Sequence, residues 1–302
     1  MESPGPFLSR LYESRRLTSG GVTEGFEGPT RVLAVCNQKG GCGKTTTAIN
    51  LAAGLGLKGY PTLLIDLDPQ AHATLGLGID PERLPHTIYD LFHDPSFRLE
   101  ETLHPTKVPN LWVAPANALL AGAQLELATV INRQERLRQA IKQIGSRFRY
   151  LLMDCSPSLN LLTINALNAA DYCLVPLQPL YYALEGMREL FTTLDLIRDG
   201  YNPGLNLLGI LPVLVDGRAR VTREILQQIR DYFKEQVLDS ESRFSAKFVE
   251  ASIVGQPVSL YSPCSRAAQD YGRLTEEILS RIRREGSLPQ SSQNGASERT
   301  AG

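Results

Sequence analysis

The feature that most constrains the fold of this chain is a glycine-rich loop between an apolar run and a helix-forming run. Residues 31–37 read RVLAVCN, the composition of a buried strand, and residues 44–57 read KTTTAINLAAGLGL, which predicts a helix. The loop contains Gly40, Gly41 and Gly43, whose backbone can approach a ligand closely because no Cβ intervenes. Free N–H groups at a helix N-terminus favour an anion, so this order of elements predicts a phosphate site.

The loop departs in two ways from the usual phosphate-binding pattern G-x-x-x-x-G-K-[ST]. Gln38 stands where the pattern has its first glycine, and Lys39 adds a second lysine to Lys44. Lys44 is expected to neutralise phosphate charge and the Thr45 hydroxyl to bind Mg²⁺. The two lysines repel each other unless a multiply charged anion lies between them. The residues expected to bind the nucleotide are Lys39, Gly40, Gly41, Cys42, Gly43, Lys44, Thr45 and Thr46.

Further apolar runs alternate with helical periodicity along the chain. Strands are expected near residues 62–68, 111–117, 150–156, 172–178 and 206–216, and helices over 126–145, 159–169 and 183–200. Near-continuous apolar strands separated by amphipathic helices predict a doubly wound, mostly parallel α/β sheet with helices on both faces. We expect one domain over residues 31–284, a flexible arm over 1–30 and a disordered tail over 285–302, because both ends are rich in small and polar residues.

The cysteine and hydropathy patterns exclude several classes of protein, whereas the net charge excludes none. With 31 Lys plus Arg against 32 Asp plus Glu, a net charge of −1 neither demands nor rules out nucleic acid or membrane. The 5 cysteines lack C-x-x-C spacing, so neither a disulfide framework nor a zinc site is expected. The sequence has no signal-peptide core and no apolar run of membrane-spanning length, which predicts a cytoplasmic protein.

Carboxylates follow two of the expected strands. LLIDLDPQ, residues 63–70, places Asp66 and Asp68 at the end of the second strand, and alternation puts both side chains on one side of it. YLLMDCSPS, residues 150–158, ends an apolar strand with Asp154, which fits a carboxylate held close to Mg²⁺. Ligands of open α/β sheets bind outside the carboxyl ends of the strands. We therefore expect all three carboxylates near the phosphate loop.

The sequence KGGCGKT resembles the deviant Walker A loop of the ATPases that include ParA/Soj, MinD and the nitrogenase iron protein. DLDPQ favours ParA/Soj over MinD, and residues 175–187 and 260–274 resemble further ParA segments. The resemblance implies ATP and Mg²⁺ as cofactors and an ATP-dependent sandwich homodimer, in which Lys39 reaches the ATP of the partner subunit. It also implies that Asp68 activates the attacking water. The Mg²⁺ site it implies consists of Thr45, Asp154 and a supporting Asp66.

By the same resemblance, the expected function is that of a partition ATPase. The ATP-bound dimer would bind DNA non-specifically, a ParB-like centromere-binding protein would stimulate ATP hydrolysis, and the cycle would segregate a chromosome or plasmid on the nucleoid. VDGRARVTREI, residues 215–225, resembles the family's DNA-contacting stretch, which implies DNA contacts by Arg218 and Arg220. Lys247 stands where relatives often carry arginine, and the resemblance implies that it is a third DNA contact. The polar C-terminal tail differs from the membrane helix of MinD, so no membrane binding is expected.

Three alternatives share parts of this pattern. A ParA relative that positions a non-DNA cargo has every motif quoted, and only its partner separates the two. A MinD-like membrane switch predicts nucleotide-dependent liposome binding, against which the polar tail argues. A small-molecule kinase or metal-insertion ATPase predicts an acceptor pocket or metal ligands, and the sequence shows neither. The adenine-contacting residues are not predicted, because the family's P-R-N-type stretch is poorly matched around residues 244–247.

Overall fold

One sheet organises the chain, with the strand order β3-β4-β2-β5-β1-β6-β7-β8. The computed structural model describes residues 28–127, 130–180 and 183–286. The strands are β1 (Arg31–Val35), β2 (Thr62–Leu67), β3 (His104–Pro105), β4 (Leu111–Ala114), β5 (Tyr150–Cys155), β6 (Tyr172–Leu177), β7 (Asn206–Val215) and β8 (Ser242–Arg243). Every neighbouring pair is parallel except β3 with β4. The predicted mostly parallel sheet is confirmed.

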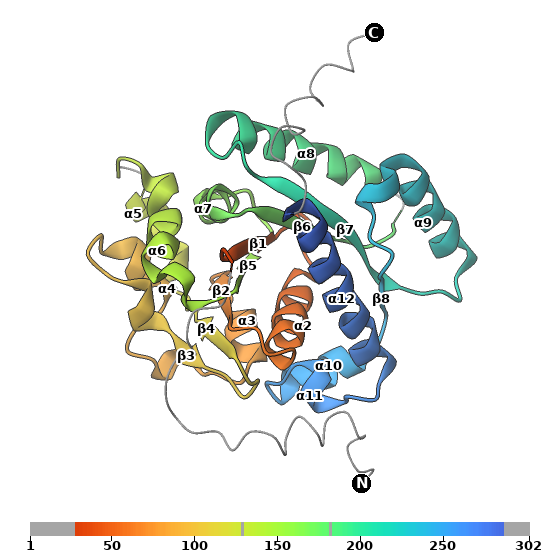
Figure 1. Cartoon of the computed structure of the whole chain (residues 1–302), viewed down its shortest axis with the longest axis horizontal. Coiled ribbons are helices and arrows are strands. Elements are labelled where there is room, and N and C mark those ends of the chain that lie inside the picture. The colour runs from red at the N-terminus through yellow and green to blue at the C-terminus, as the bar shows by residue number, and fades with distance from the viewer. Residues whose placement is uncertain (1–27, 128–129, 181–182, 287–302) are drawn as a thin grey trace.

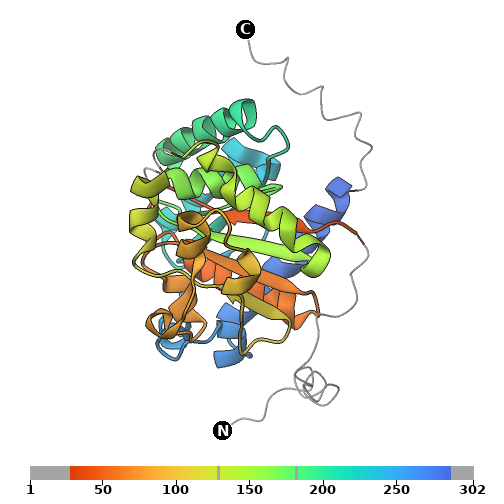
Figure 2. The same ribbon diagram turned by 90° about the vertical axis from the view of Figure 1, so that its left-hand side faces the viewer.

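Helices cover both faces of this sheet (Figures 1 and 2). They are α2 (Lys44–Leu57), α3 (His72–Gly76), α4 (Ile88–His93), α5 (Leu120–Glu126), α6 (Arg136–Ile144), α7 (Leu161–Ala169), α8 (Ala183–Gly200), α9 (Arg220–Phe233), α10 (Lys247–Ile253), α11 (Val258–Tyr261) and α12 (Arg266–Gly286). One apolar core lies under α4 to α9, and a second lies under α2, α3 and α12. This is the doubly wound arrangement that the alternation of strands and helices predicts.

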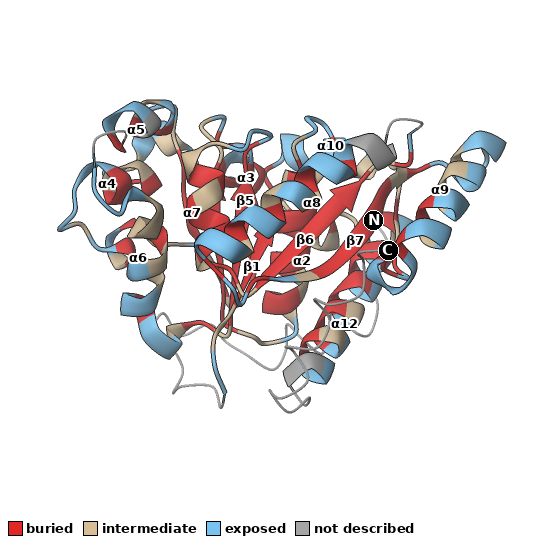
Figure 3. Ribbon diagram, turned by 90° about the horizontal axis from the view of Figure 1, so that it is seen from above, coloured by how far each residue is buried: buried red, intermediate tan, exposed pale blue. Residues whose placement is uncertain are grey.

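The continuous apolar character of the strands follows from burial on both sides. In β1, Val32 and Ala34 pack into the core under α4 to α9, while Leu33 and Val35 pack into the core under α2 and α12. Successive side chains of a strand point to opposite faces, so a strand covered on both faces needs an apolar residue at every position. Figure 3 shows the strands as the buried centre of the molecule and the outer helix faces as exposed.

The position of β1 determines where a ligand can bind. It lies between β5 and β6, and the chain passes from β1 to β2 on the far side of β5 before it returns to β6 on the other side of β1. In open α/β sheets, ligands bind outside the carboxyl ends of the strands where the strand order reverses. The glycine-rich loop leaves the carboxyl end of β1 and therefore lies at this point.

The helix predicted over residues 126–145 is wrong in its bounds. The structure has two helices there, α5 ending at Glu126 and α6 beginning at Arg136. Asn132, between them, has a left-handed backbone with φ 57°, which cannot continue an α-helix. The short helices α3, α4, α10 and α11 and the longer α9 were not predicted.

Most of the predicted arm and tail lies outside the described residues. Residues 1–27 and 287–302 are not described, so the flexible arm and the disordered tail stay predictions. Helix α12 continues to Gly286, two residues past the predicted end of the domain at residue 284. Within residues 28–286, as far as they are described, no helix is long and apolar enough to cross a membrane.

Candidate nucleotide-binding site

The glycine-rich loop joins β1 directly to the N-terminus of α2. Gly41 and Gly43 have φ values of 71° and 75°, a backbone region that favours glycine. Gly43 is also the N-cap of α2, and neither a capping side chain nor an acidic residue occupies the first turn of this helix. The N–H groups at the start of α2 therefore have no side-chain acceptor and are available to an anion.

The two lysines of the loop differ in environment. The side chain of Lys44 is buried, and its Nζ donates a hydrogen bond to the carbonyl oxygen of Lys39 at 2.9 Å. The side chain of Lys39 is exposed and makes no hydrogen bond or ion pair with any described residue. Cys42 is buried beneath the loop, where its Sγ donates to the same carbonyl at 3.0 Å, and burial raises the pKa of its thiol. One cation thus faces the loop and the other faces solvent.

A cavity of about 700 Å³ opens above the loop. Its lining consists of Gly40, Gly41, Gly43, Lys44, Thr45, Thr46, Asp68, Pro69, Gln70, His72, Ala121, Ser156, Pro157, Ser158, Asn160 and Leu214. The structure thus brings most of the predicted phosphate-contacting residues together with Asp68. Lys39, Cys42, Asp66 and Asp154, also predicted, do not line this cavity.

Asp66 and Asp68 do not face the same space, contrary to the expectation from strand alternation. Strand β2 ends at Leu67, so Asp68 lies beyond it and is half-buried at the cavity. Asp66 is fully buried, and its carboxylate accepts hydrogen bonds from Thr74 N at 2.9 Å, Thr74 Oγ1 at 2.7 Å and Asp68 N at 3.1 Å. Burial raises the pKa of Asp66 to about 6, against the opposing effect of these donors. Asp66 therefore connects the end of β2 to α3.

Asp154 lies directly beside Asp66, because the two residues are register partners on β5 and β2. It is also fully buried, but neither of its carboxylate oxygens has a hydrogen-bond partner among the described residues. Burial raises the pKa of Asp154 well above its usual value, and the neighbouring Asp66 charge adds to the effect. The Thr45 hydroxyl is close enough to lower this pKa without reaching hydrogen-bond geometry. Buried carboxylate oxygens without partners are rare in folded proteins and call for a bound ligand or ion.

These residues fit a Mg²⁺ ion that is completed by ligands from outside the chain. Among residues 28–127, 130–180 and 183–286, no three His, Cys, Asp or Glu side chains come together as a ready metal site. Mg²⁺ is usually held by only one or two protein ligands together with phosphate and water oxygens. The unpartnered oxygens of Asp154 near the Thr45 hydroxyl are a donor set of that kind.

Sequence reasoning missed several residues of the site. Asn37 ties the loop to β6, because its Nδ2 donates to Pro176 O at 2.8 Å while its Oδ1 accepts from Lys39 N at 3.1 Å. Leu214 lines the cavity with a φ of 54°, which is uncommon for a residue other than glycine. Its place inside the apolar run NLLGILPVLV gave no signal. The polar residues of SPSLN after β5 did offer one, because they begin two residues after Asp154.

The three residues predicted to contact DNA lie outside this cavity. Arg218 is exposed, has no side-chain hydrogen bond or ion pair within the described part of the chain, and lines a separate cavity of about 650 Å³ with Arg243 and Arg266. Arg220 is also exposed but donates to Glu224 Oε1 at 2.7 Å. Lys247 donates to Glu250 at 2.6 Å.

Comparisons with known sequences identify the family to which the chain belongs. A family model described as an AAA domain matches residues 30–207. The chromosome partitioning protein ParA of Myxococcus xanthus is 42% identical over 266 residues, covering 88% of this chain and 93% of the relative. The sporulation initiation inhibitor protein Soj of Bacillus subtilis is 39% identical over 248 residues, covering 82% of this chain and 98% of the relative.

Solved structures of similar proteins share the fold of this chain. A cobyrinic acid a,c-diamide synthase from Mycobacterium smegmatis with bound ADP and magnesium has a TM-score of 0.75 and 33% identity, covering 86% of this chain and 98% of that one. The cell division ATPase MinD of Pyrococcus furiosus has a TM-score of 0.69 at 24% identity, covering 83% and 98%, and shows the shared fold alone. With its phosphate-binding loop, its sheet and these relatives, the chain belongs to the ParA/Soj family of P-loop proteins.

Proposed function

We propose that this chain is a Mg²⁺-dependent ATPase that hydrolyses ATP to ADP and phosphate in a DNA partition cycle. The uncapped N-terminus of α2 and the cavity of about 700 Å³ above it support nucleotide binding. The similar Mycobacterium smegmatis protein was solved with ADP and magnesium. The relatives of this chain in Myxococcus xanthus and Bacillus subtilis are named for chromosome partitioning and for inhibition of sporulation initiation.

The observation that carries the proposal is the pair of unpartnered, buried oxygens of Asp154 next to Thr45. When bound, Mg²⁺ would supply positive charge against the phosphates of ATP. Asp154 and the Thr45 hydroxyl would hold the ion, with water and phosphate oxygens as its other ligands. Asp66 supports this shell from behind, because its own oxygens already accept three hydrogen bonds from Thr74 and Asp68.

The two lysines of the loop would contact phosphates of different nucleotides. Lys44 gives up its contact with the Lys39 carbonyl and turns its ammonium group toward the phosphates above α2. Lys39, whose side chain is exposed and unpaired among the described residues, extends to the nucleotide of a partner subunit in an ATP-dependent sandwich dimer. Asp68 is the half-buried carboxylate at the cavity wall, and there it orients the attacking water.

The dimer would bind DNA without sequence preference and release it after hydrolysis. Arg218 is the strongest candidate for a phosphate contact, since its guanidinium has no ion pair with a described residue. Arg220 and Lys247 would have to leave Glu224 and Glu250 first. A ParB-like centromere-binding protein would stimulate hydrolysis, and the protein would act in the cytoplasm on the nucleoid. A ParA-like protein for another cargo would use the same nucleotide site.

The test is DNA binding by Asp68→Ala with ATP–Mg²⁺, with ADP–Mg²⁺ and without nucleotide, on random duplex DNA across a salt series. If Asp68 orients the attacking water, this variant should bind ATP without hydrolysing it, and should therefore bind DNA tightly with ATP only and less tightly as salt rises. Lys44→Ala is the control that should bind neither nucleotide nor DNA. DNA binding that is equal in all three nucleotide states, or absent from all of them, would contradict the DNA-binding part of the proposal. The ATPase part is tested separately, by measuring ATP turnover of the unmodified chain.

A further inference from the structure

An apolar groove lies between helices α2 and α12, and it shares no lining residue with the cavity above the phosphate-binding loop. It has a volume of about 400 Å³, and helix α11 with the turn after it closes one side. Figure 1 shows α12 beside α2, with α11 next to both. A volume of this size is within the range of ligand sites in proteins. The proposed function does not use this groove.

Small residues keep the groove open. On α2, Asn50, Gly54 and Leu57 line it at spacings of four and three residues, so they share one face of the helix. On α12, Ala268 and Gly272 are one turn apart, and a Cβ added to Gly272 would have nothing within 4 Å. At the two glycines and the alanine, neither helix has a side chain larger than a methyl group that could fill the space.

Most polar side chains of the groove are already paired within the chain. Those that pair with other described residues are Asn50, Lys58, Tyr271, Arg273, Thr275 and Glu276. The amide of Asn50, for example, donates to Thr46 O and accepts from Val258 N, both at 2.8 Å. Ser259 differs, because its Oγ is buried and has no hydrogen-bond partner among the described residues. The groove thus offers apolar surface together with one buried hydroxyl that lacks a partner.

The sequence contains a segment of matching character in residues 6–14, PFLSRLYES, which lie outside the described residues. Phe7, Leu8, Leu11 and Tyr12 have the i, i+1, i+4, i+5 spacing that places side chains on one face of an α-helix. A helix of this length is marginal in water on its own. It would therefore form on a surface that buries its apolar face.

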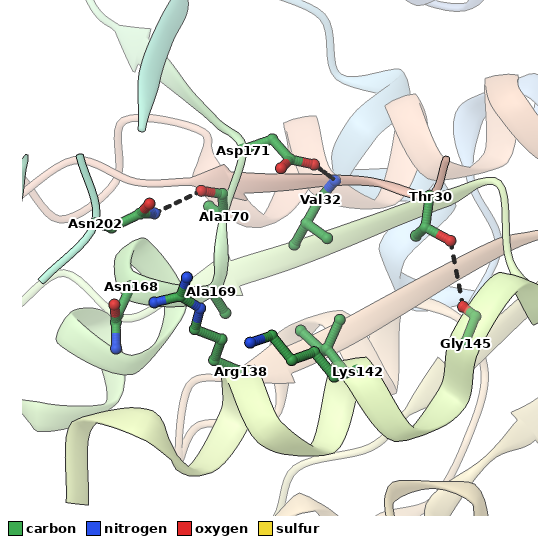
Figure 4. Close-up of a pocket in the computed structure, with 11 residues that line it drawn as sticks. Thr30, Val32, Arg138, Lys142, Gly145, Asn168, Ala169, Ala170, Asp171 and Asn202 are labelled. Atoms are coloured by element: carbon green, nitrogen blue, oxygen red, sulfur yellow. Dashed lines mark hydrogen bonds between the residues drawn. The ribbon is translucent and has the colours of Figure 1, made fainter. Parts of the chain in front are cut away.

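Contacts at the entrance to β1 fix the point at which this segment joins the described chain. Figure 4 shows Thr30 Oγ1, which donates to Gly145 O at 3.3 Å. The Arg149 guanidinium donates to Pro29 O. Residues 1–27 therefore leave the molecule from a defined place at this edge of the sheet.

A short series of contacts leads from this place to the groove. The Arg149 guanidinium lies 5.7 Å from the centre of the Tyr150 ring, which packs edge-on against Tyr60 at 5.3 Å. Tyr60 N donates to Leu55 O at 3.2 Å, in the last turns of α2, the helix that lines the groove. Residues 15–27 can span roughly 40 Å when extended, so they are long enough to carry the apolar segment to the groove.

We propose that residues 6–14 of this chain dock into the groove between α2, α11 and α12 as an amphipathic helix. The apolar face of the segment packs against the small residues of the groove, and the Ser259 hydroxyl forms a hydrogen bond with the segment. An amphipathic helix laid into an apolar groove is a common mode of peptide recognition. Because the segment belongs to the same chain, the linker sets its effective concentration at the groove.

The test is amide hydrogen exchange of the full chain, measured by mass spectrometry. The amides of residues 8–14 should exchange at least about tenfold more slowly than those of an unstructured segment, because docking protects them. Leu11→Asp should restore the unstructured rate, since it places a charge on the apolar face. Gly272→Gln should do the same from the side of the groove, and the open space at Gly272 allows this variant to fold.

Two matched variants separate docking from added charge and from the loss of a glycine. Ser9→Asp adds the same charge outside the apolar face, and Gly186→Gln makes the same exchange on α8, where a Cβ also has open space. Both should keep the protection of residues 8–14. An unchanged exchange pattern over β1 and β5 shows that each variant is folded.

Three outcomes would overturn the proposal. The first is that residues 8–14 exchange at the unstructured rate in the unmodified chain. The second is that their protection persists in Gly272→Gln. The third is protection that grows with protein concentration, which would assign the groove to a segment of a second copy instead of the same chain.

Discussion

The unpartnered carboxylate of Asp154 leads to a prediction about stability that runs against the usual effect of a core substitution. Asp154→Asn should stabilise the nucleotide-free protein, because it replaces a buried group that is charged or must take up a proton with a neutral group of the same shape. No protein hydrogen bond to a described residue is lost, since neither oxygen accepts one. Most substitutions at fully buried positions destabilise.

The expected gain follows from the cost of ionising or protonating a buried carboxyl group, since the Asn amide also lacks hydrogen-bond partners but carries no charge and takes up no proton. At neutral pH each pH unit by which burial raises the pKa of Asp154 corresponds to about 1.4 kcal/mol, so the unfolding free energy should rise by about 1–3 kcal/mol. For a chain of this size, each kcal/mol corresponds to about 2 °C in Tm. The same variant should lose the additional stabilisation that Mg²⁺ gives in the presence of ADP, since the ion would have lost its carboxylate.

The assay is urea and thermal unfolding at neutral pH, with and without ADP–Mg²⁺, and Asp66→Asn is the matched control. It makes the same change at the register partner of Asp154 on the neighbouring strand. The carboxylate of Asp66 accepts three hydrogen bonds, and an Asn side chain cannot accept all of them with its single oxygen. Asp66→Asn should therefore lower the unfolding free energy by about 1–3 kcal/mol. If Asp154→Asn were destabilised as much as Asp66→Asn, the account of Asp154 as a carboxylate that awaits a metal would be wrong.

Three further predictions follow from the same site and its surroundings. In the folded state, the pKa of Asp66 is about 6 and that of Asp154 also exceeds the ordinary 3.8. The unfolding free energy should therefore fall as the pH rises from 3.8 through about 6. Urea unfolding across this pH window tests the prediction, and an unfolding free energy that rises with pH would contradict it. Gly43→Ala should cost about 1–3 kcal/mol because of its φ of 75°, whereas Gly40→Ala, with open space at its Cβ, should be nearly neutral in the same unfolding assay. Arg218→Ala should lower the salt dependence of DNA binding by about one phosphate contact. Arg220→Ala should lower it less, because Arg220 already pairs with Glu224. Equal effects of the two variants would mean that this ion pair does not restrain Arg220.

The centre of the fold could be predicted from the sequence because β1, β2 and β4 to β7 are apolar at successive positions, whereas the two-residue strands β3 (HP) and β8 (SR) have no such pattern and were not predicted. In β5, Leu151 and Met153 pack into one core and Leu152 into the other, so burial on both faces is written into the composition of the strand itself. Helix α2 was equally predictable, because a glycine N-cap follows a strand and precedes a run of small and apolar residues. The bounds of α5 and α6 were not, because the left-handed backbone of Asn132 is a property of tertiary packing.

The candidate site was predictable in its loop and less so in its carboxylates. Asp66 and Asp154 both follow an apolar run, and nothing in their neighbours says which of them has free oxygens. The difference comes from Thr74, eight residues beyond Asp66, which can donate twice because α3 folds back over the end of β2. A sequence gives such a contact only once the turn between strand and helix is known.

The basic residues show the opposite case, in which the sequence held a signal that went unused. Arg220 and Glu224 are four positions apart at the start of α9, and Lys247 and Glu250 are three apart at the start of α10. Opposite charges at these spacings lie next to each other on a helix surface. Arg218 precedes α9 and has no acidic residue at such a spacing within a helix. Of the three candidates, the local pattern alone therefore leaves Arg218 as the cation with no helical counter-charge, and so as the residue whose replacement should affect a polyanion most.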